Sequence, residues 1–247
     1  MYFTGLTFLT TASQNIRFIT ATLLVDRKKK TIFDAIQQVI RIYKGKGHEV
    51  DNIEFEEDKD EKPIHTIMAD NEFKALKEDL GEMGMNVHVV SKNEHVPEVE
   101  RQNRVIKERT RAVIQTMPCK RILKKMRIAL IQCTIFWLNN IPKEGQDQSP
   151  KEIIMGEQKL DTKYICKLPF GAYMQVHEDR EITNTTLPRT TGSINLGPSN
   201  LKGEHKFLSL ETGDIIMRRR WTEMPVPTDV IVRQEEMSSN PNNSLRD

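Results

Sequence analysis

The sequence predicts an α/β fold in which a mixed sheet is flanked by helices and followed by a small β-rich appendage. Three observations lead to this prediction. β-rich runs and helical patterns alternate up to residue 156, as in layered α/β domains. Two long segments after Pro97 repeat apolar residues at helical spacing. Beyond Leu168 the pattern changes to short strands separated by turns.

The N-terminal part predicts strands followed by a helix. Residues 6–10 and 16–25 are β-rich and are separated by the turn-like sequence ASQN, so these strands should pair antiparallel. A first strand, barely present, precedes them. Thr31 is a candidate N-cap for a helix, because apolar residues recur at helical spacing from Ile32 to Tyr43. The sequence KGKG should end this helix.

The next part predicts a strand, a helix and a second strand. HTIMAD at 65–70 and MNVHVVS at 85–91 have the composition of strands, and EFKALKEDLGEMG at 72–84 that of a helix closed by glycine. The acidic loop at 54–63 has no calcium-loop spacing and is expected to be solvated. An RNase H-like sheet fits this order of elements, although the order does not single it out.

Two long helices should follow Pro97. The apolar run from Ile128 to Leu138 is shorter than the ~20 residues that a bilayer requires, so a buried helix is expected there. Ser149 and Pro150 should start a short helix. Strands are expected within segments 170–178, 191–197, 206–221 and 227–232. The predicted domains are a core at 1–156, a β-rich module at 157–232 and a disordered tail at 233–247.

Composition limits the function only weakly. The chain has 247 residues, 37% of them hydrophobic and 29% charged, which suits one large domain or a domain with a small appendage. The net charge of +2 says little about partners, so a signal must come from local patches. Cys119, Cys133 and Cys166 are too far apart for a zinc pair, and their odd number fits a reducing compartment. No secretory leader and no membrane span are predicted.

Asp70 and Glu100 are the candidate metal ligands. Asp70 stands at the end of a predicted strand, where α/β folds expose functional side chains. Glu100 lies one turn into the helix that follows the next strand. Two such carboxylates could share a divalent metal, because magnesium prefers oxygen ligands and keeps several waters. The alternative is that Asp70 is an ordinary helix cap.

A basic run follows Glu100. Between Glu100 and Arg127 there are ten cations and only two acids. Glu100, Arg104, Lys107 and Arg111 share one helix face at three- and four-residue steps. This face, with Arg101 beside it, would present charge that neutralises phosphates next to the candidate carboxylate. The alternative is a solvated face opposite the apolar stripe.

Other candidate sites are weak. His88 and His95 have no His or Cys partner at a ligand spacing. The Arg218–Arg220 patch in the appendage either touches nucleic acid or blocks an edge strand, and the second reading is slightly favoured.

The chain resembles the integrase region of copia-like retrotransposon polyproteins over nearly its whole length. No single motif decides the resemblance, but their number and order make it specific. The matching pieces are IMADNEF at 67–73, NEHVPEVERQNRVIKERTR at 93–111, IFWLNNIPKEG at 135–145, SPKEIIMG at 149–156, LPFGAYMQVHED at 168–179, RTTGSINLGP at 189–198 and FLSLETGDIIMRRRWTEMPVP at 207–227.

The resemblance implies an RNase H-like fold with an Asp, Asp, Glu set that binds magnesium or manganese. Such a site joins element DNA ends to target DNA. Asp70 matches the second Asp and Glu100 matches the Glu, at a spacing a little shorter than the best-known retroviral pattern. The resemblance also implies DNA as partner, with self-association as a further expectation, and residence in the nucleus.

The first Asp of the set is not among the matching residues. In the resembling elements it lies in a strand just upstream of the residues that align with Met1–Phe3, so the chain is expected to lack the start of its first strand. Asp26 and Asp34 should not reach the site. We therefore expect no strand-transfer activity from this chain. The alternatives are a non-catalytic DNA- or protein-binding module derived from an integrase, and a fragment with no selected role.

Overall fold

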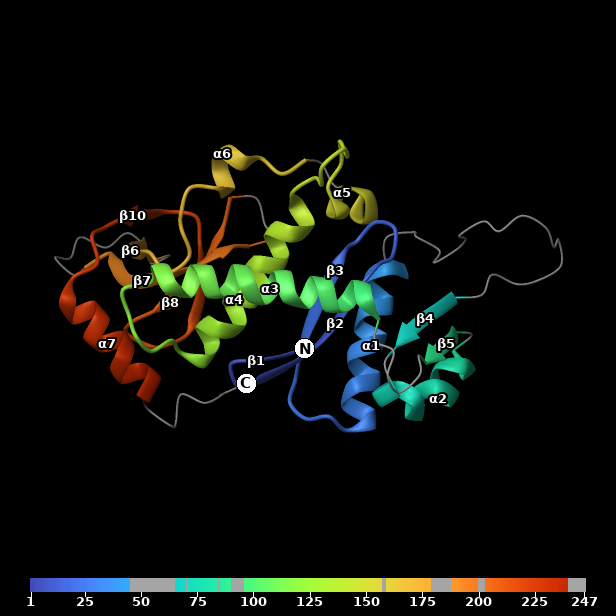
Figure 1. The fold of residues 1–247 in the computed structure, drawn as a ribbon. Helices are drawn as coiled ribbons and strands as arrows, with labels where there is room; N and C mark the ends of the chain where they lie inside the picture. Colours follow the sequence, from blue (N-terminus) through green and yellow to red (C-terminus); the bar gives the residue numbers. More distant parts are fainter. Residues whose placement is uncertain are drawn as a thin grey trace. The chain divides into compact units, whose positions relative to one another are not determined.

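The computed structural model shows a mixed α/β chain, which confirms the predicted fold class (Figure 1). The chain divides into two compact units, Met1–Lys107 with Leu138–Lys159 and Glu108–Trp137 with Leu160–Asp247. We call them the first and the second unit and describe each by itself. The structure describes residues 1–44, 65–69, 71–83, 85–89, 96–156, 159–178, 188–199 and 203–239.

The first unit begins with an antiparallel three-stranded sheet in the order β1-β2-β3. Its strands are β1 (Tyr2–Phe3), β2 (Leu6–Ala12) and β3 (Ile19–Leu24). Thr4 and Gly5 connect β1 to β2 with φ angles of 48° and 82°. Two consecutive residues with positive φ form the tight hairpin turn whose twist matches that of paired strands. The two predicted strands and their antiparallel pairing are confirmed.

Helix α1 (Lys29–Lys44) starts before the predicted cap. Thr31 lies inside the helix, and its hydroxyl donates to Asp26 Oδ1 at 2.6 Å. The same oxygen accepts the Lys28 N–H at 3.1 Å, so Asp26 fixes the turn immediately before α1. The Thr31 hydrogen bond also lowers the pKa of Asp26. Asp26 therefore has a local structural role directly after β3.

Strands β4 (His65–Ala69) and β5 (Met85–Val89) pair in parallel, from His65 opposite Met85 to Ala69 opposite Val89. A parallel pair needs a crossover connection. The predicted single helix is here a 3₁₀ helix, η1 (Asn71–Leu76), followed by α2 (Lys77–Glu82). The apolar face of α1 packs with this crossover and with β5 in one core: Ile32, Ala35, Ile36, Leu76, Leu80, Met85 and Val87.

Two long helices follow, as predicted. Helix α3 spans Pro97–Thr116 and α4 spans Lys124–Asn140, and each contributes residues to both units. Helix α5 (Pro150–Met155) begins with the predicted signal: the Ser149 hydroxyl accepts the Glu152 N–H at 3.2 Å, and the Glu152 carboxylate accepts the Ser149 N–H at 2.6 Å. This reciprocal pair satisfies two donors at the helix start.

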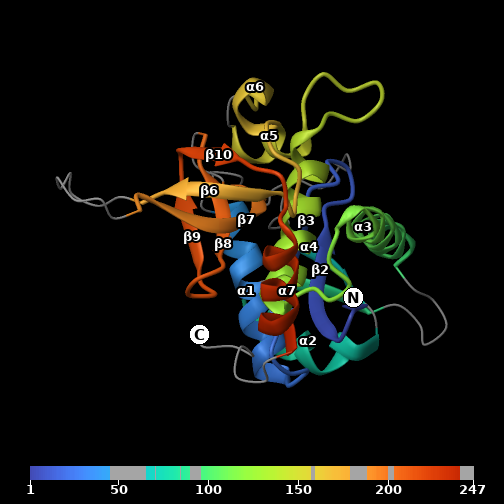
Figure 2. The same cartoon turned by 90° about the vertical axis from the view of Figure 1, so that its left-hand side faces the viewer.

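The second unit contains an antiparallel five-stranded sheet in the order β10-β6-β7-β8-β9, whose strands can be followed in Figure 2. A short helix, α6 (Thr162–Ile165), precedes it, and α7 (Thr228–Ser239) follows it. The strands are β6 (Tyr173–His177), β7 (Thr190–Pro198), β8 (His205–Ser209), β9 (Ile215–Arg218) and β10 (Trp221–Glu223).

This sheet is strongly curled. The edge strands β9 and β10 are joined by Arg219 and Arg220 alone, a link that spans at most about 11 Å. A flat sheet would separate its two edges by about 19 Å, because neighbouring strands lie about 4.8 Å apart. The Trp221 ring of β10 also lies 4.8 Å from the His205 ring of β8, although two strands stand between them in the order. The sheet therefore closes toward a small barrel.

Helix α7 corrects the sequence prediction for the C-terminal segment. Residues 227–232 were expected to form a strand and residues from 233 onward to be disordered, whereas Thr228–Ser239 is a helix. Val230, Gln234 and Met237 are buried at helical spacing. Val230 and Met237 pack with Leu123, Met126, Ala129 and other residues of the second unit's core. Residues 240–247 lie outside the described residues.

Candidate nucleic-acid and metal site

Asp70 lies outside the described residues. The preceding strand β4 ends at Ala69, so Asp70 follows its carboxyl end, as the sequence predicted. The distance from Asp70 to Glu100 is not defined by the described residues. The convergence of the two carboxylates therefore remains a prediction.

Glu100 lies in the first turn of α3, on the exposed side of the helix. Its N–H donates to the Val96 carbonyl at 3.2 Å, so its backbone is already helical. Glu98 also lies in this turn and is exposed. Carboxylates at this end of a helix interact favourably with its dipole. Glu100 is therefore well placed for solvent, for a ligand or for simple stabilisation of the helix.

Helix α3 carries the four candidate DNA-binding cations. Arg104 and Arg111 are exposed together with Glu100, and Lys107 is half-buried. Ile106 is fully buried on the opposite side, where the predicted apolar stripe runs. Arg101 is also exposed, roughly 60° around the helix from Arg104, because successive residues are about 100° apart. The helix thus presents a row of cations that starts one turn after the candidate carboxylate.

Asn103 is a residue of this region that the sequence analysis missed. It lies one turn after Glu100, and its side-chain oxygen is buried with no hydrogen-bond partner among the residues that the structure describes. A buried acceptor without a donor is unfavourable. An amide oxygen here could accept from a water or coordinate a hard cation. In the sequence, its position one turn after the candidate Glu100 was the signal that could have identified Asn103.

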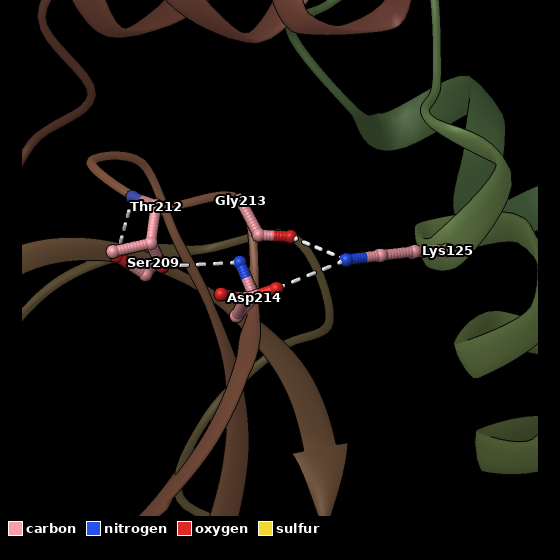
Figure 3. Close-up of polar contacts among 5 residues, drawn as sticks. All are labelled: Lys125, Ser209, Thr212, Gly213 and Asp214. Atoms are coloured by element: carbon pink, nitrogen blue, oxygen red, sulfur yellow. Dashed lines mark hydrogen bonds and ion pairs between the residues drawn. The ribbon is translucent and has the colours of Figure 1, made fainter. Parts of the chain in front are cut away.

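Basic residues around the start of α4 make hydrogen bonds and an ion pair within the second unit. The sequence did not predict these contacts. The Lys125 ammonium donates to the Gly213 carbonyl at 2.9 Å and lies 3.3 Å from an Asp214 carboxylate oxygen (Figure 3). Ser209 and Thr212 fix the same turn by hydrogen bonds to its backbone. The Arg121 guanidinium donates to the Ser239 hydroxyl at 3.0 Å. These contacts account for part of the basic run without nucleic acid.

The Arg218–Arg220 patch ends the edge strand β9 and begins the link to β10. Arg218 Nη1 donates to the Met217 carbonyl at 2.8 Å. Arg219 and Arg220 are exposed. Charge on an edge strand discourages pairing with other chains. Nucleic-acid binding by this patch remains an open alternative.

The cysteines do not form a reactive site. Cys119, Cys133 and Cys166 are all free thiols. Burial raises the pKa of the Cys133 thiol to about 11. Burial also raises the pKa of Cys119. Raised pKa values keep both thiols protonated and unreactive near neutral pH.

The candidate ligands offer oxygen atoms, the type of donor that magnesium and manganese prefer. Within the described parts of the chain, no three His, Cys, Asp or Glu side chains cluster around a common point. Glu100 and the unpartnered oxygen of Asn103 are oxygen donors, which these cations prefer. The described residues thus offer part of a ligand set, to which the sequence adds Asp70.

No helix within the described ranges is long and apolar enough to span a membrane.

Comparisons with known proteins give structural neighbours only. No protein-family model matches the sequence. No curated protein matches it either. The structure is similar to the catalytic core domain of BIV integrase, with a TM-score of 0.45 and 16% identity over 63% of this chain and 90% of that chain. It is also similar to a simian T-cell lymphotropic virus intasome determined with the PP2A regulatory subunit B56 gamma, with a TM-score of 0.34 and 11% identity over 90% and 81% of the two chains.

Proposed function

We propose that this chain is an integrase-type core that binds DNA along α3, with Asp70 and Glu100 beside the bound backbone. The exposed face of α3 carries this proposal, because Glu100 is followed at helical spacing by Arg104 and Arg111, with Lys107 at its edge. Such a row suits a duplex backbone, whose phosphates are neutralised by Lys and Arg. The motif order that resembles copia-like integrases supports the same function.

Asp70 and Glu100 would hold magnesium or manganese, and the Asn103 oxygen would hold a water or the cation itself. When bound, these metals activate an attacking oxygen and stabilise the leaving one in phosphoryl transfer. The residues of α3 would position the DNA strand against the carboxylates. Nuclear residence and self-association are further expectations of this proposal.

Asp70 and Glu100 would supply two of the three carboxylates that the resemblance implies. The first acidic residue in the sequence is Asp26. Asp26 follows β3 and is held by Thr31 and Lys28. Two carboxylates hold a metal pair more weakly than three, because the cage loses a full negative charge. The local structural role of Asp26 favours a second candidate function, a DNA-binding module without catalysis.

DNA binding tests the core of the proposal. We expect Arg104→Glu with Lys107→Glu to weaken binding of a duplex at least tenfold and to lower its salt dependence, since each lost phosphate contact lowers the salt slope by about 1. The matched control is Arg109→Glu, an exposed arginine roughly 140° around the same helix from Arg104. Equal binding by the double variant and the wild type would make α3 a plain solvated face.

Activity separates the two candidate functions. Processing and strand-transfer assays with magnesium and with manganese should show no turnover by the 247-residue chain, while DNA binding is retained. Turnover that disappears in Glu100→Gln would instead assign an active site to this chain and reject the non-catalytic module.

A further inference from the structure

A second pair of cations in the first unit lies outside α3. Arg17 belongs to the loop between β2 and β3, and Lys143 belongs to the loop after α4. Asn139, in the last turn of α4, connects these two regions. Its side-chain amide donates to the Ile19 carbonyl at 2.7 Å, and its Oδ1 accepts the Ile19 N–H at 2.9 Å. Since Arg17 precedes Ile19 by two residues and Lys143 follows Asn139 by four, the two loops are neighbours.

The backbone at Lys143 is well defined. The Lys143 carbonyl accepts the Gln146 N–H at 2.9 Å and thereby closes a turn. Gly145 stands at the third position of this turn with a φ of 79°, as a type II turn requires. Pro142 restricts the chain immediately before the turn. The backbone from which the Lys143 side chain extends is therefore held by a turn.

Among the residues that the structure describes, the Lys143 ammonium has no acceptor. Its nitrogen is shielded from solvent and makes no hydrogen bond to any residue in the described part of the chain. An ammonium removed from water without an acceptor is unfavourable. Burial lowers the pKa of Lys143, and the nearby positive charge of Arg17 lowers it further. Within the described residues, the Lys143 ammonium thus has no anionic partner.

Arg17 is held in an uncommon conformation. Its φ of 59° lies in the left-handed region, which few residues other than glycine adopt. The Arg17 N–H donates to the Ser13 carbonyl at 2.9 Å, and the Ser13 N–H donates to the Phe18 carbonyl at 3.0 Å. The Arg17 side chain is exposed. The loop therefore holds the backbone of Arg17, whose accessible positive charge lies near the shielded ammonium.

We propose that Arg17 and Lys143 form a binding site for a phosphate group. Arginine offers a planar fork of donors and lysine a point charge, and together they can bind two oxygens of one phosphate. The phosphate belongs either to a nucleic-acid backbone or to a small compound. Only the first case rests on the proposed DNA-binding function. The site uses residues of the β2–β3 and α4–α5 loops and none of the cations of α3.

Thermal unfolding of the 247-residue chain tests the site without metal or DNA. Inorganic phosphate should raise the Tm above that in chloride of equal ionic strength, because a ligand that binds the native state stabilises it. Lys143→Met should raise the Tm in chloride by about 2 °C or more by removing the unpaired charge, and it should abolish the response to phosphate. Arg17→Asn, which tolerates the left-handed backbone, should also lose most of this response. Lys30→Met, at an exposed lysine of α1, should behave like the wild type.

Duplex DNA distinguishes the two sources of phosphate. If Lys143→Met lowers the slope of log K against log salt by about 1, the site binds backbone phosphate. If the slope is unchanged while inorganic phosphate still stabilises the wild type through Lys143, the ligand is a small phosphate compound. A wild type that responds equally to phosphate and chloride, with an unchanged DNA slope in Lys143→Met, would overturn the site. That result would leave the α3 test unaffected, so the two failures can be told apart.

Discussion

Helices α3 and α4 are similar in length, at 20 and 17 residues, but they differ sharply in burial. More than half of the residues of α3 are exposed, and its buried residues follow one stripe through Ile106 and Thr110. In α4 only Gln132 is exposed. A helix that is buried nearly all round belongs to a core, whereas an amphipathic helix leaves one face for solvent or a partner.

The comparison shows why a count of basic residues is a poor guide to a nucleic-acid surface. The sequence places ten cations between Glu100 and Arg127. Those of α3 lie mainly on its exposed face, whereas Lys125 of α4 contacts a turn of the second unit. The spacing of residues in the sequence distinguishes the exposed cations of α3 from Lys125 only in part, because the partners of Lys125 are distant in sequence. The following predictions test the contrast, from the largest expected effect to the smallest.

Leu130→Ala should be the most damaging change. Leu130 of α4 is 1% exposed, and truncation of a fully buried leucine typically lowers the free energy of unfolding by about 2–5 kcal/mol. Gln132→Ala, two residues away on the same helix, should change it by less than about 0.5 kcal/mol. Urea denaturation measures both. Similar losses in the two variants would contradict the burial of α4.

Asn139→Ala should have the second-largest effect on the free energy of unfolding. The substitution leaves the N–H and carbonyl of Ile19 without their side-chain partners. Each buried group left unpaired costs about 1–3 kcal/mol, so the two together should lower the free energy of unfolding by about 2 kcal/mol or more. Asn15→Ala, at an exposed loop position, is the control. A loss below about 0.5 kcal/mol for Asn139→Ala would mean that water replaces both hydrogen bonds.

Lys125→Met should have a moderate effect on stability and none on DNA. The variant removes one hydrogen bond and one ion pair whose Asp214 side chain is 70% exposed, so the loss should be about 0.5–1.5 kcal/mol. DNA affinity and its salt slope should equal those of the wild type, in contrast to the double variant at Arg104 and Lys107. Weaker DNA binding by Lys125→Met would extend the nucleic-acid surface to α4.

The smallest effect concerns the thiol of Cys133 on α4. Its pKa of about 11 exceeds its usual value of 9.0, so the folded chain binds the proton more tightly. The raised pKa of Cys133 stabilises the folded chain fully below pH 9, and this stabilisation is lost as the pH rises toward 11. At pH 8 an alkylating reagent should modify exposed Cys166 first and leave Cys133 unmodified in the native chain. Mass spectrometry of the labelled peptides checks the order, and equal labelling would refute it.

Local signals in the sequence predicted local structure well. Ser149 and Pro150 are neighbours in the sequence, so this local signal was enough to place the start of α5. The start of α1 was misplaced because Thr31 is a suitable cap in the sequence, whereas in the structure its hydroxyl donates to Asp26 from inside the helix. Helix α7 was missed because a β-branched run at residues 230–232 suggests a strand. Burial of Val230 and Met237 overrides that preference.

The candidate site could be predicted only in part. The exposed face of α3 follows from periodicity, which the sequence contains. The unpartnered oxygen of Asn103 and the shielded ammonium of Lys143 depend on neighbours that no spacing rule identifies. The ion pair of Lys125 joins residues 89 positions apart. The pairing of Asp70 with Glu100 remains a prediction.

The two-residue link between β9 and β10 also protects the second unit against aggregation. Open sheet edges can recruit strands from neighbouring molecules. Here the chain brings both edges together through Arg219 and Arg220, and β10 is secured where Trp221 pairs with Val176. During synthesis the sheet stays vulnerable until this last strand has emerged from the ribosome and paired. A stop codon placed just before Trp221 should therefore give a product that precipitates, while the longer chain stays in solution.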